Sequence, residues 1–207
     1  MKELKEEGYN LVITGEMGIG NTTTSAAVLC ALTGADVADV TGRGGGLTDR
    51  AFARKKDVLR TSVGRRPIRR DDAVDVLCAV GGLDIAAMTG AFLGCAHEGI
   101  PAAVDGFISV TAALCAVTLC PAVRDYLFLS HDSYEVGYRL AAERLGLEPC
   151  LHLGMRLGEG SGCPLLFRVM EGACGVMSGM ATFAEAAIHD GYLDEIRAQD
   201  SFTVDRP

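Results

Sequence analysis

Short apolar segments alternate with longer amphipathic ones along this chain, which is typical of repeated strand–helix units. The apolar and β-branched segments predict buried strands at 9–14, 100–104 and 126–129. The longer segments predict helices at 22–32, 47–61, 73–80, 85–96, 134–145 and about 164–177, with a short helix after Thr182. We therefore expect an α/β protein of the three-layer α/β/α, Rossmann-like class, with a mostly parallel sheet covered on both faces.

Capping residues mark the starts of several of these helices. Asn21 or Thr22 is the predicted N-cap of the first helix. Asp71 and Asp72 are expected to begin the helix at 73–80, and Asp84 is the predicted N-cap of the helix after it.

One uncharged run, from Gly106 to Val123, is close to the length of about 18 residues at which membrane spans begin. It contains the hydroxyl residues Ser109, Thr111 and Thr118, and charged residues lie close on both sides. A buried helix that packs under the sheet explains this run better than a membrane span does.

Composition and charge exclude several classes of protein. The 207 residues are 49% hydrophobic, which provides for a full core in a single domain over residues 1–207. The formal net charge of −8 disfavours nucleic acid as a partner, because phosphate backbones select basic surfaces. The eight cysteines show no C-x-x-C spacing, which indicates small buried thiols in a reducing cytoplasm and no zinc site.

A glycine-rich segment from Gly15 to Thr24 connects the first predicted strand to the first predicted helix. Its glycines let the backbone approach a ligand closely, and the free N–H groups at the helix start make a site for phosphate. The spacing of Gly15 and Gly20 copies a P-loop, but Asn21 stands where the phosphate-contacting lysine must be. A dinucleotide-binding fingerprint that begins at Gly18 is also incomplete, because a threonine replaces its last small residue.

A plain strand–turn–helix connection would also explain these glycines. Glu16 favours a ligand site, because a carboxylate within a phosphate loop is electrostatically costly unless it serves the ligand. We therefore expect a nucleoside-phosphate site with a further polar task beside it. The glycine-rich turn at 41–46 is expected to be a loop, either a flexible link or a second edge of the ligand site.

A second glycine-rich motif, Gly158-Glu159-Gly160-Ser161-Gly162, surrounds a glutamate. The flanking glycines leave this glutamate little local cover, although a solvent-facing loop is the alternative, since most glutamates are exposed. Four polar side chains directly follow strand-like or glycine-rich segments: Glu16, Asp105, Ser133 and Glu159. Because the carboxyl ends of parallel strands share one edge of a sheet, we expect these four to converge on one rim.

Six segments occur in the order that is found in one enzyme family: Gly15-Glu16-Met17-Gly18-Ile19-Gly20-Asn21-Thr22-Thr23, Val80-Gly81-Gly82, Asp105-Gly106-Phe107, Pro121-Ala122-Val123-Arg124, Ser130-His131 and Arg156-Leu157-Gly158-Glu159-Gly160-Ser161-Gly162. Together they resemble the nicotinate-nucleotide:dimethylbenzimidazole phosphoribosyltransferases, which make α-ribazole phosphate for the lower ligand of cobalamin. The resemblance runs from about Gly8 to Glu185, which is nearly the whole chain.

The resemblance implies a parallel α/β/α sheet, a homodimer, and no metal or other cofactor. It implies nicotinate mononucleotide and 5,6-dimethylbenzimidazole, or a related azole, as substrates. Glu159 resembles the catalytic base of the family and Glu16 its second active-site carboxylate. The positions that resemble substrate-binding residues are Gly18, Gly20, Asn21, Thr22, Lys55, Gly81, Gly82, Asp105, Gly106, Ser133, Arg156, Gly158 and Gly160.

The chain departs from the family in one respect. Family members usually carry a substantial segment ahead of the first glycine motif, which helps to hold the aromatic base, whereas residues 1–14 precede it here. We therefore expect an N-terminally shortened member. Three alternatives remain: a weak or inactive mononucleotide-binding relic, a nucleoside triphosphatase of unusual type, and a scaffold without enzymatic activity.

Overall fold

The computed structural model describes residues 1–189 together with residues 191, 194 and 198. The chain divides into two compact units, residues 1–168 and residues 169–207. The first unit contains the sheet and every side chain that the sequence places in a candidate site. A single domain over the whole chain stays a prediction.

The sheet of the first unit has three parallel strands in the order β1 (Val12–Ile13), β2 (Ala102–Val104) and β3 (Leu127–Leu129). The central strand β2 is buried along its whole length. Ala102 pairs with Val12 on one side and with Leu127 on the other, so the three strands end at the same edge. This arrangement confirms the predicted α/β class with a parallel sheet.

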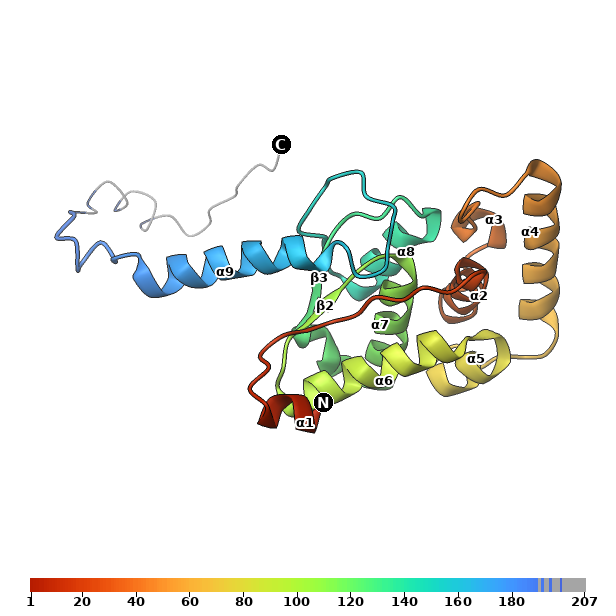
Figure 1. Ribbon diagram of the computed structural model, residues 1–207, viewed down its shortest axis with the longest axis horizontal. Coiled ribbons are helices and arrows are strands. Elements are labelled where there is room, and N and C mark those ends of the chain that lie inside the picture. Colours follow the sequence, from red (N-terminus) through yellow and green to blue (C-terminus); the bar gives the residue numbers. More distant parts are fainter. Residues whose placement is uncertain (190, 192–193, 195–197, 199–207) are drawn as a thin grey trace. The chain divides into compact units, whose positions relative to one another are not determined.

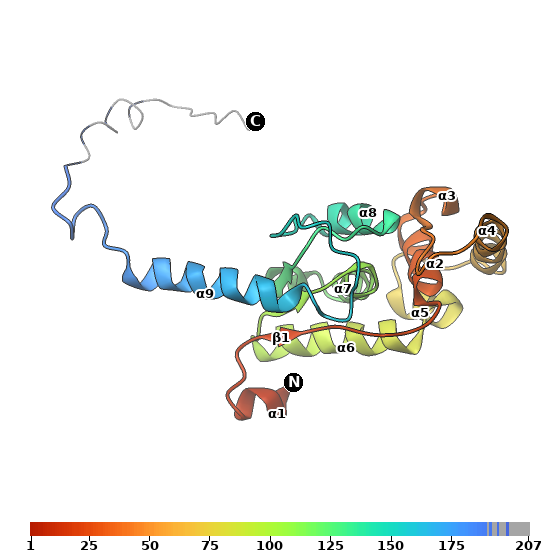
Figure 2. The same cartoon turned by 45° about the horizontal axis from the view of Figure 1, so that its top comes forward.

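The helices follow in chain order (Figure 1) as α1 (Lys2–Glu6), α2 (Asn21–Thr33), α3 (Val37–Val40), α4 (Asp49–Gly64), α5 (Ala73–Val80), α6 (Leu83–Glu98), α7 (Phe107–Leu119), the 3-10 helix η1 (Pro121–Tyr126), α8 (Val136–Leu145) and α9 (Cys163–Gly179). Figure 2 shows α7 between α6 and α8, and α7 contacts both of them. Helix α7 is buried continuously from residue 107 to 116, as expected for a helix that packs under the sheet. Within the described part of the chain, no helix is both long and apolar enough to cross a membrane.

The predicted helix starts are confirmed at one position and wrong at two. Asp72 caps α5, and its carboxylate accepts hydrogen bonds from the backbone N–H groups of Val74 and Asp75. Helix α2, however, has Gly20 as its N-cap in a left-handed conformation with φ +92°, and no side chain caps it. Helix α6 has Gly82 as its N-cap, in an extended conformation and again without a side-chain cap, so Asp84 lies within its first turn.

Three further differences concern segments outside the sheet. The short helix α3 has no counterpart in the sequence analysis. The uncharged run ends as a helix at Leu119, because Pro121 cannot continue it, and the chain turns through η1 before β3. The short helix predicted after Thr182 is a series of turns over residues 183–187.

Candidate active site

A cavity of about 410 Å³, called the central cavity below, lies where β1 and β2 end. Its lining includes the four polar residues that were expected to meet on one rim, namely Glu16, Asp105, Ser133 and Glu159. Their convergence is therefore confirmed, and it brings together segments more than a hundred positions apart in the sequence. The position agrees with the general rule that open α/β sheets bind ligands at the carboxyl ends of their strands.

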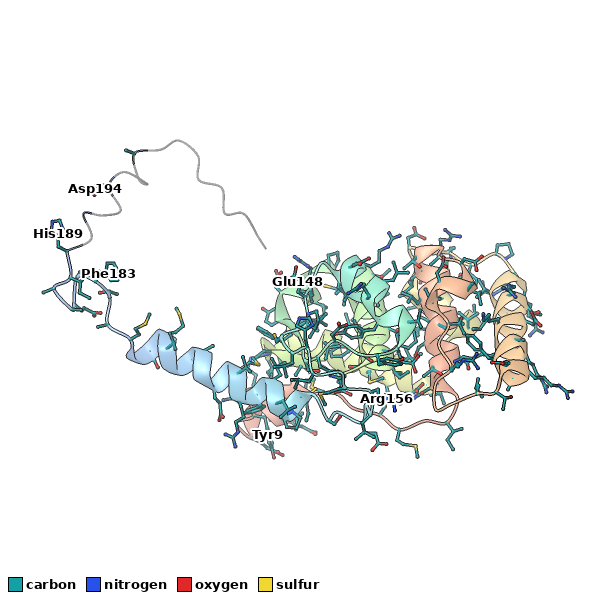
Figure 3. The ribbon with its side chains drawn as sticks, turned by 90° about the horizontal axis from the view of Figure 1, so that it is seen from above. Tyr9, Glu148, Arg156, Phe183, His189 and Asp194 are labelled. Atoms are coloured by element: carbon teal, nitrogen blue, oxygen red, sulfur yellow. The ribbon has the colours of Figure 1, made fainter. Side chains whose placement is uncertain are left out.

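Most of the other predicted substrate-binding residues also line this cavity: Gly18, Gly20, Asn21, Thr22, Gly106, Arg156 and Gly158. Arg156 is the one cationic side chain in the described lining, and Figure 3 shows it beside the segment that leads from β1 to α2. Its guanidinium lies 5.8 Å from the ring centre of Tyr134, which supports its orientation by a cation–π contact.

Four predicted residues do not line the central cavity. Gly160 contributes its backbone N–H from beneath the surface. Gly81 and Gly82 lie at the junction of α5 and α6, where a side chain at Gly82 would collide with the Asp84 carboxylate. Lys55 lines a neighbouring cavity of about 490 Å³, called the side cavity below.

The side cavity is linked to the central one through shared backbone. Ile19, Gly20, Thr22, Gly44 and Gly45 line both cavities. The turn at 41–46 therefore forms a second edge of the site. The glycine content of this turn is equally consistent with a flexible link, because glycines alone do not show what a loop faces.

Lys55 holds together two segments that line the site. Its side chain is buried, and Nζ donates hydrogen bonds of 2.9 Å to the Thr22 hydroxyl and to the Gly42 carbonyl. Burial lowers the pKa of Lys55, and the negative charge of Glu135 opposes that shift. The contact to Thr22 couples this ammonium group to the first turn of α2.

Glu135 is a functional candidate that the sequence analysis missed. It lines the central cavity, and burial raises the pKa of its carboxyl group, against the opposing effect of Lys55. Its carboxylate packs so closely on Gly42 that a side chain at position 42 would overlap it. No motif marks Glu135, since the contact joins a loop to the start of α8 from a distant part of the chain.

Glu16 lies half-buried in the segment just before the N-terminus of α2. Burial raises the pKa of its carboxyl group, a hydrogen bond from the Asn21 side chain opposes this, and the negative charges of Asp84, Asp105 and Glu159 raise it further. The site is therefore strongly acidic on one side. A positively charged ligand group would be stabilised there, because it would relieve the repulsion among these carboxylates.

Glu159 is exposed at the tip of the glutamate loop, which comprises residues 158–162. Gly158, Glu159 and Gly160 have φ values of +78°, +58° and +78°, so three successive residues adopt the left-handed conformation. The loop packs directly on Gly15, where a side chain would overlap the backbone of Gly160. The two glycine-rich motifs therefore touch each other through bare backbone.

Asp105 lies beneath this loop with only 2% of its surface exposed. Its two carboxylate oxygens accept hydrogen bonds of 3.0 Å from the backbone N–H groups of Gly160 and Gly162. Burial, aided by the nearby negative charge of Asp105, raises the pKa of the Cys163 thiol to about 12, so this thiol stays protonated at neutral pH. Among the described residues, no group of three or more His, Cys, Asp or Glu side chains is placed to hold a metal ion.

Comparison with known proteins agrees with this geometry. The sequence family described as phosphoribosyltransferase matches residues 1–188. The chain is 50% identical over 204 residues to the nicotinate-nucleotide–dimethylbenzimidazole phosphoribosyltransferase of Clostridium perfringens (strain 13 / Type A), covering 99% of this chain and 56% of that protein. It is 46% identical over 190 residues to the enzyme of the same name from Pseudomonas aeruginosa (strain UCBPP-PA14), covering 92% and 54%.

A solved structure extends the likeness to three dimensions. The crystal structure of CobT from Thermus thermophilus matches with a TM-score of 0.85 and 37% sequence identity, covering 92% of this chain and 56% of that one. The chain thus spans about half the length of the curated relatives it matches. With its family match over residues 1–188, the chain belongs to the phosphoribosyltransferase family that its six ordered segments predicted.

Proposed function

We propose that this chain transfers the phosphoribosyl group of nicotinate mononucleotide to 5,6-dimethylbenzimidazole or a related azole. The products are α-ribazole 5′-phosphate, used for the lower ligand of cobalamin, and nicotinate. The names of its relatives support this substrate pair. The observation that carries the proposal is the position of Glu159, an exposed carboxylate at the mouth of a cavity that also contains the start of α2.

The proposed reaction is a displacement at C1′ of the ribose. The bond from C1′ to the pyridinium nitrogen breaks, and its electron pair neutralises the departing nicotinate ring. One nitrogen of the benzimidazole attacks C1′ from the opposite face, so the β configuration becomes α. Glu159 accepts the proton from the other ring nitrogen, and such general-base assistance contributes typically about 10²–10⁴-fold to the rate.

The charges of the site suit this substrate pair. The pyridinium ring carries a positive charge until it leaves, and Glu16 supplies a neighbouring carboxylate that stabilises it. The phosphate binds to the N–H groups at the start of α2, where no side-chain cap competes for them, with Arg156 adding a positive charge. Lys55 acts on this end of the substrate through its hydrogen bond to Thr22.

A second candidate function is a low-activity or inactive mononucleotide-binding relic of the same family. The exposure of Glu159 favours it, because a base without surrounding walls does not hold the azole in line with C1′. A nucleoside triphosphatase fits less well, since Asn21 replaces the lysine of a P-loop. We further propose that the protein acts as a cytoplasmic homodimer, a location that agrees with its eight free cysteines.

The test is a turnover assay with the purified chain, nicotinate mononucleotide and dimethylbenzimidazole. We expect release of nicotinate, and a product whose anomeric proton signal in NMR spectra identifies the α configuration. Mononucleotide binding without turnover would favour the relic. Hydrolysis of ATP, or failure to bind either substrate, would contradict the proposed function.

A further inference from the structure

We propose that Asp105 is a positioning residue, whose buried carboxylate holds the glutamate loop in the conformation that presents Glu159 to the central cavity. This inference rests on the proposed function, in which Glu159 is the base. It assigns Asp105 a task at the back of the loop, in place of the direct substrate contact that the resemblance implies.

The glutamate loop needs an external support. Left-handed backbone is readily available to Gly158 and Gly160 but sparsely populated by a residue such as Glu159. Such conformations persist only where the surrounding structure over-determines them. Within the loop, the described backbone bond is the one from the Ser161 N–H to the Gly158 carbonyl, at 3.0 Å. The carbonyls of Gly160 and Gly162 accept from the N–H groups of Cys163 and Leu166 at the start of α9, which leaves the N–H groups of these two glycines to be held from elsewhere.

Asp105 supplies that hold with both of its oxygens. Oδ2 accepts from the Gly160 N–H and Oδ1 accepts from the Gly162 N–H, each at 3.0 Å. Bonds of this kind, from backbone N–H to an ionised carboxylate, are stronger than neutral ones, and burial strengthens them further. The loop is therefore attached one residue and three residues beyond Glu159, and both attachment points lie on one rigid group.

The carboxylate is itself fixed by the sheet. Asp105 directly follows the central strand β2, and its backbone N–H donates to the Ser109 hydroxyl at 3.2 Å. His131 lies behind it, with Nδ1 3.7 Å from Oδ1 of Asp105, and Ser130 and His131 share a hydrogen bond of 3.0 Å. Ser130 and His131 are completely buried, so this support does not depend on solvent.

Two close packing contacts prevent the loop from moving away from the Asp105 carboxylate. A side chain at Gly162 would overlap the His131 ring, and a side chain at Gly15 would overlap the Gly160 backbone. The loop is thus confined between His131 on one side and the end of β1 on the other. A shift of Asp105 is expected to move Glu159, because a closely packed loop transmits such a displacement.

Direct substrate contact by Asp105 is the alternative, and its burial argues against it. Only 2% of the residue is exposed, and each oxygen already accepts from a backbone N–H group. The reacting groups would therefore feel Asp105 through the position of Glu159. A positioning role predicts that the rate changes while mononucleotide affinity does not.

Asp105→Asn in the full chain is the first test. An amide oxygen can keep one of the two bonds, but the NH₂ group then faces the other backbone N–H. We expect the amide protons of Gly160 and Gly162 to exchange at least about 10-fold faster, kcat to fall about 10–100-fold and the KM for mononucleotide to change less than about 3-fold.

Asp75→Asn is the matched control. Asp75 also accepts a backbone N–H bond, from Arg69 at 2.8 Å, and pairs with Arg66, but it lies in α5 and lines neither cavity. This control variant should lose stability without a change in kcat or in the exchange at Gly160 and Gly162.

The link to Glu159 is tested with the double variant Asp105→Asn, Glu159→Gln. If Asp105 acts through Glu159, adding Asp105→Asn to the Glu159→Gln variant should cause no further loss of activity. Fully multiplicative losses would overturn the link. Unchanged exchange of the Gly160 and Gly162 amide protons in Asp105→Asn would show that Asp105 does not hold the loop.

Asp105→Glu serves if the asparagine variant does not fold, since it keeps both acceptor oxygens on a longer arm. We expect it to protect the Gly160 and Gly162 amides nearly as in the native protein while kcat remains reduced; a native kcat would overturn the positioning role. The exchange measurement needs no substrate. If the native protein shows no turnover, the proposed function is contradicted. The exchange of the Gly160 and Gly162 amide protons still decides whether Asp105 holds the loop.

Discussion

The side-chain amide of Asn21 donates a hydrogen bond to the carboxylate of Glu16, and it also reaches Asp84 at 3.3 Å. A P-loop would have a lysine at position 21, which would form an ion pair with Glu16 and neutralise it. A neutral amide satisfies the carboxylate without cancelling its charge. The acidic character of the site is thereby kept.

Glu16 should make the stability of the protein depend on pH. Its pKa lies above the ordinary value of 4.5, mainly because it is partly buried, so the folded protein retains a proton that the unfolded chain has lost. The contribution of Glu16 to stability therefore falls as the pH rises from 4.5 through the raised pKa. Glu16→Gln, which cannot ionise, should gain in melting temperature relative to the native protein over that interval. A difference that stays constant between pH 4 and pH 8 would contradict the shift.

Glu159→Gln should separate binding from chemistry. The amide keeps the size and polarity of the side chain but cannot accept the azole proton. We expect turnover to fall by about 10²–10⁴-fold while mononucleotide affinity stays within about 3-fold. Calorimetry and a steady-state assay on the same preparation measure both quantities, and unchanged turnover would remove Glu159 from the mechanism.

Transferase activity should survive exhaustive treatment with EDTA. The pyridinium ring leaves as a neutral group, so no Lewis acid is needed to assist its departure. The check is nicotinate release before and after chelation, with a metal-dependent phosphatase as a positive control for chelation. Complete loss with rescue by one metal ion would favour phosphate-transfer chemistry instead.

The two halves of the substrate site should differ in completeness. In the proposed reaction the start of α2 and Arg156 would bind the phosphoribosyl end, whereas Glu159, which would face the aromatic base, is exposed. We expect measurable binding of nicotinate mononucleotide, poor binding of dimethylbenzimidazole and little choice among azoles. Separate calorimetric titrations with each ligand decide this. Tight and selective dimethylbenzimidazole binding by this chain alone would show that the base pocket is complete.

We expect the protein to be a dimer or a larger species in solution. Within the described residues, β1 pairs with β2 on one side and leaves its other edge unpaired, and Ile13 at that edge is 45% exposed. An open edge with an exposed apolar side chain favours pairing with another chain. Light scattering across a concentration series measures the mass, and a monomer at every concentration would contradict the prediction.

Sequence reasoning succeeded where local chemistry determines structure. Asp72 at the start of α5 acts where its residue type predicts, because capping depends on neighbours within a turn. The convergence of Glu16 and Glu159 was also predictable, since parallel strands direct their following loops to one edge.

The remaining features depend on contacts between distant segments. Position after a strand predicted that Asp105 lies at the rim, but not that its carboxylate turns inward to Gly160 and Gly162. Glu135 carries no motif, so its place in the cavity lining follows only from the packed structure. Residue types indicate which chemistry is available, whereas packing decides which groups face the ligand.

The backbone contact between Gly15 and Gly160 has a consequence for how such a protein can evolve. Gly15 cannot acquire a side chain by itself, because the main chain of Gly160 occupies the space that the side chain would fill, and Gly160 has a φ of +78°, which residues other than glycine rarely adopt. A change at position 15 would need a simultaneous withdrawal of the loop at 160, and this would carry Glu159 with it. We therefore expect position 15 to accept a larger residue only together with a change in the glutamate loop.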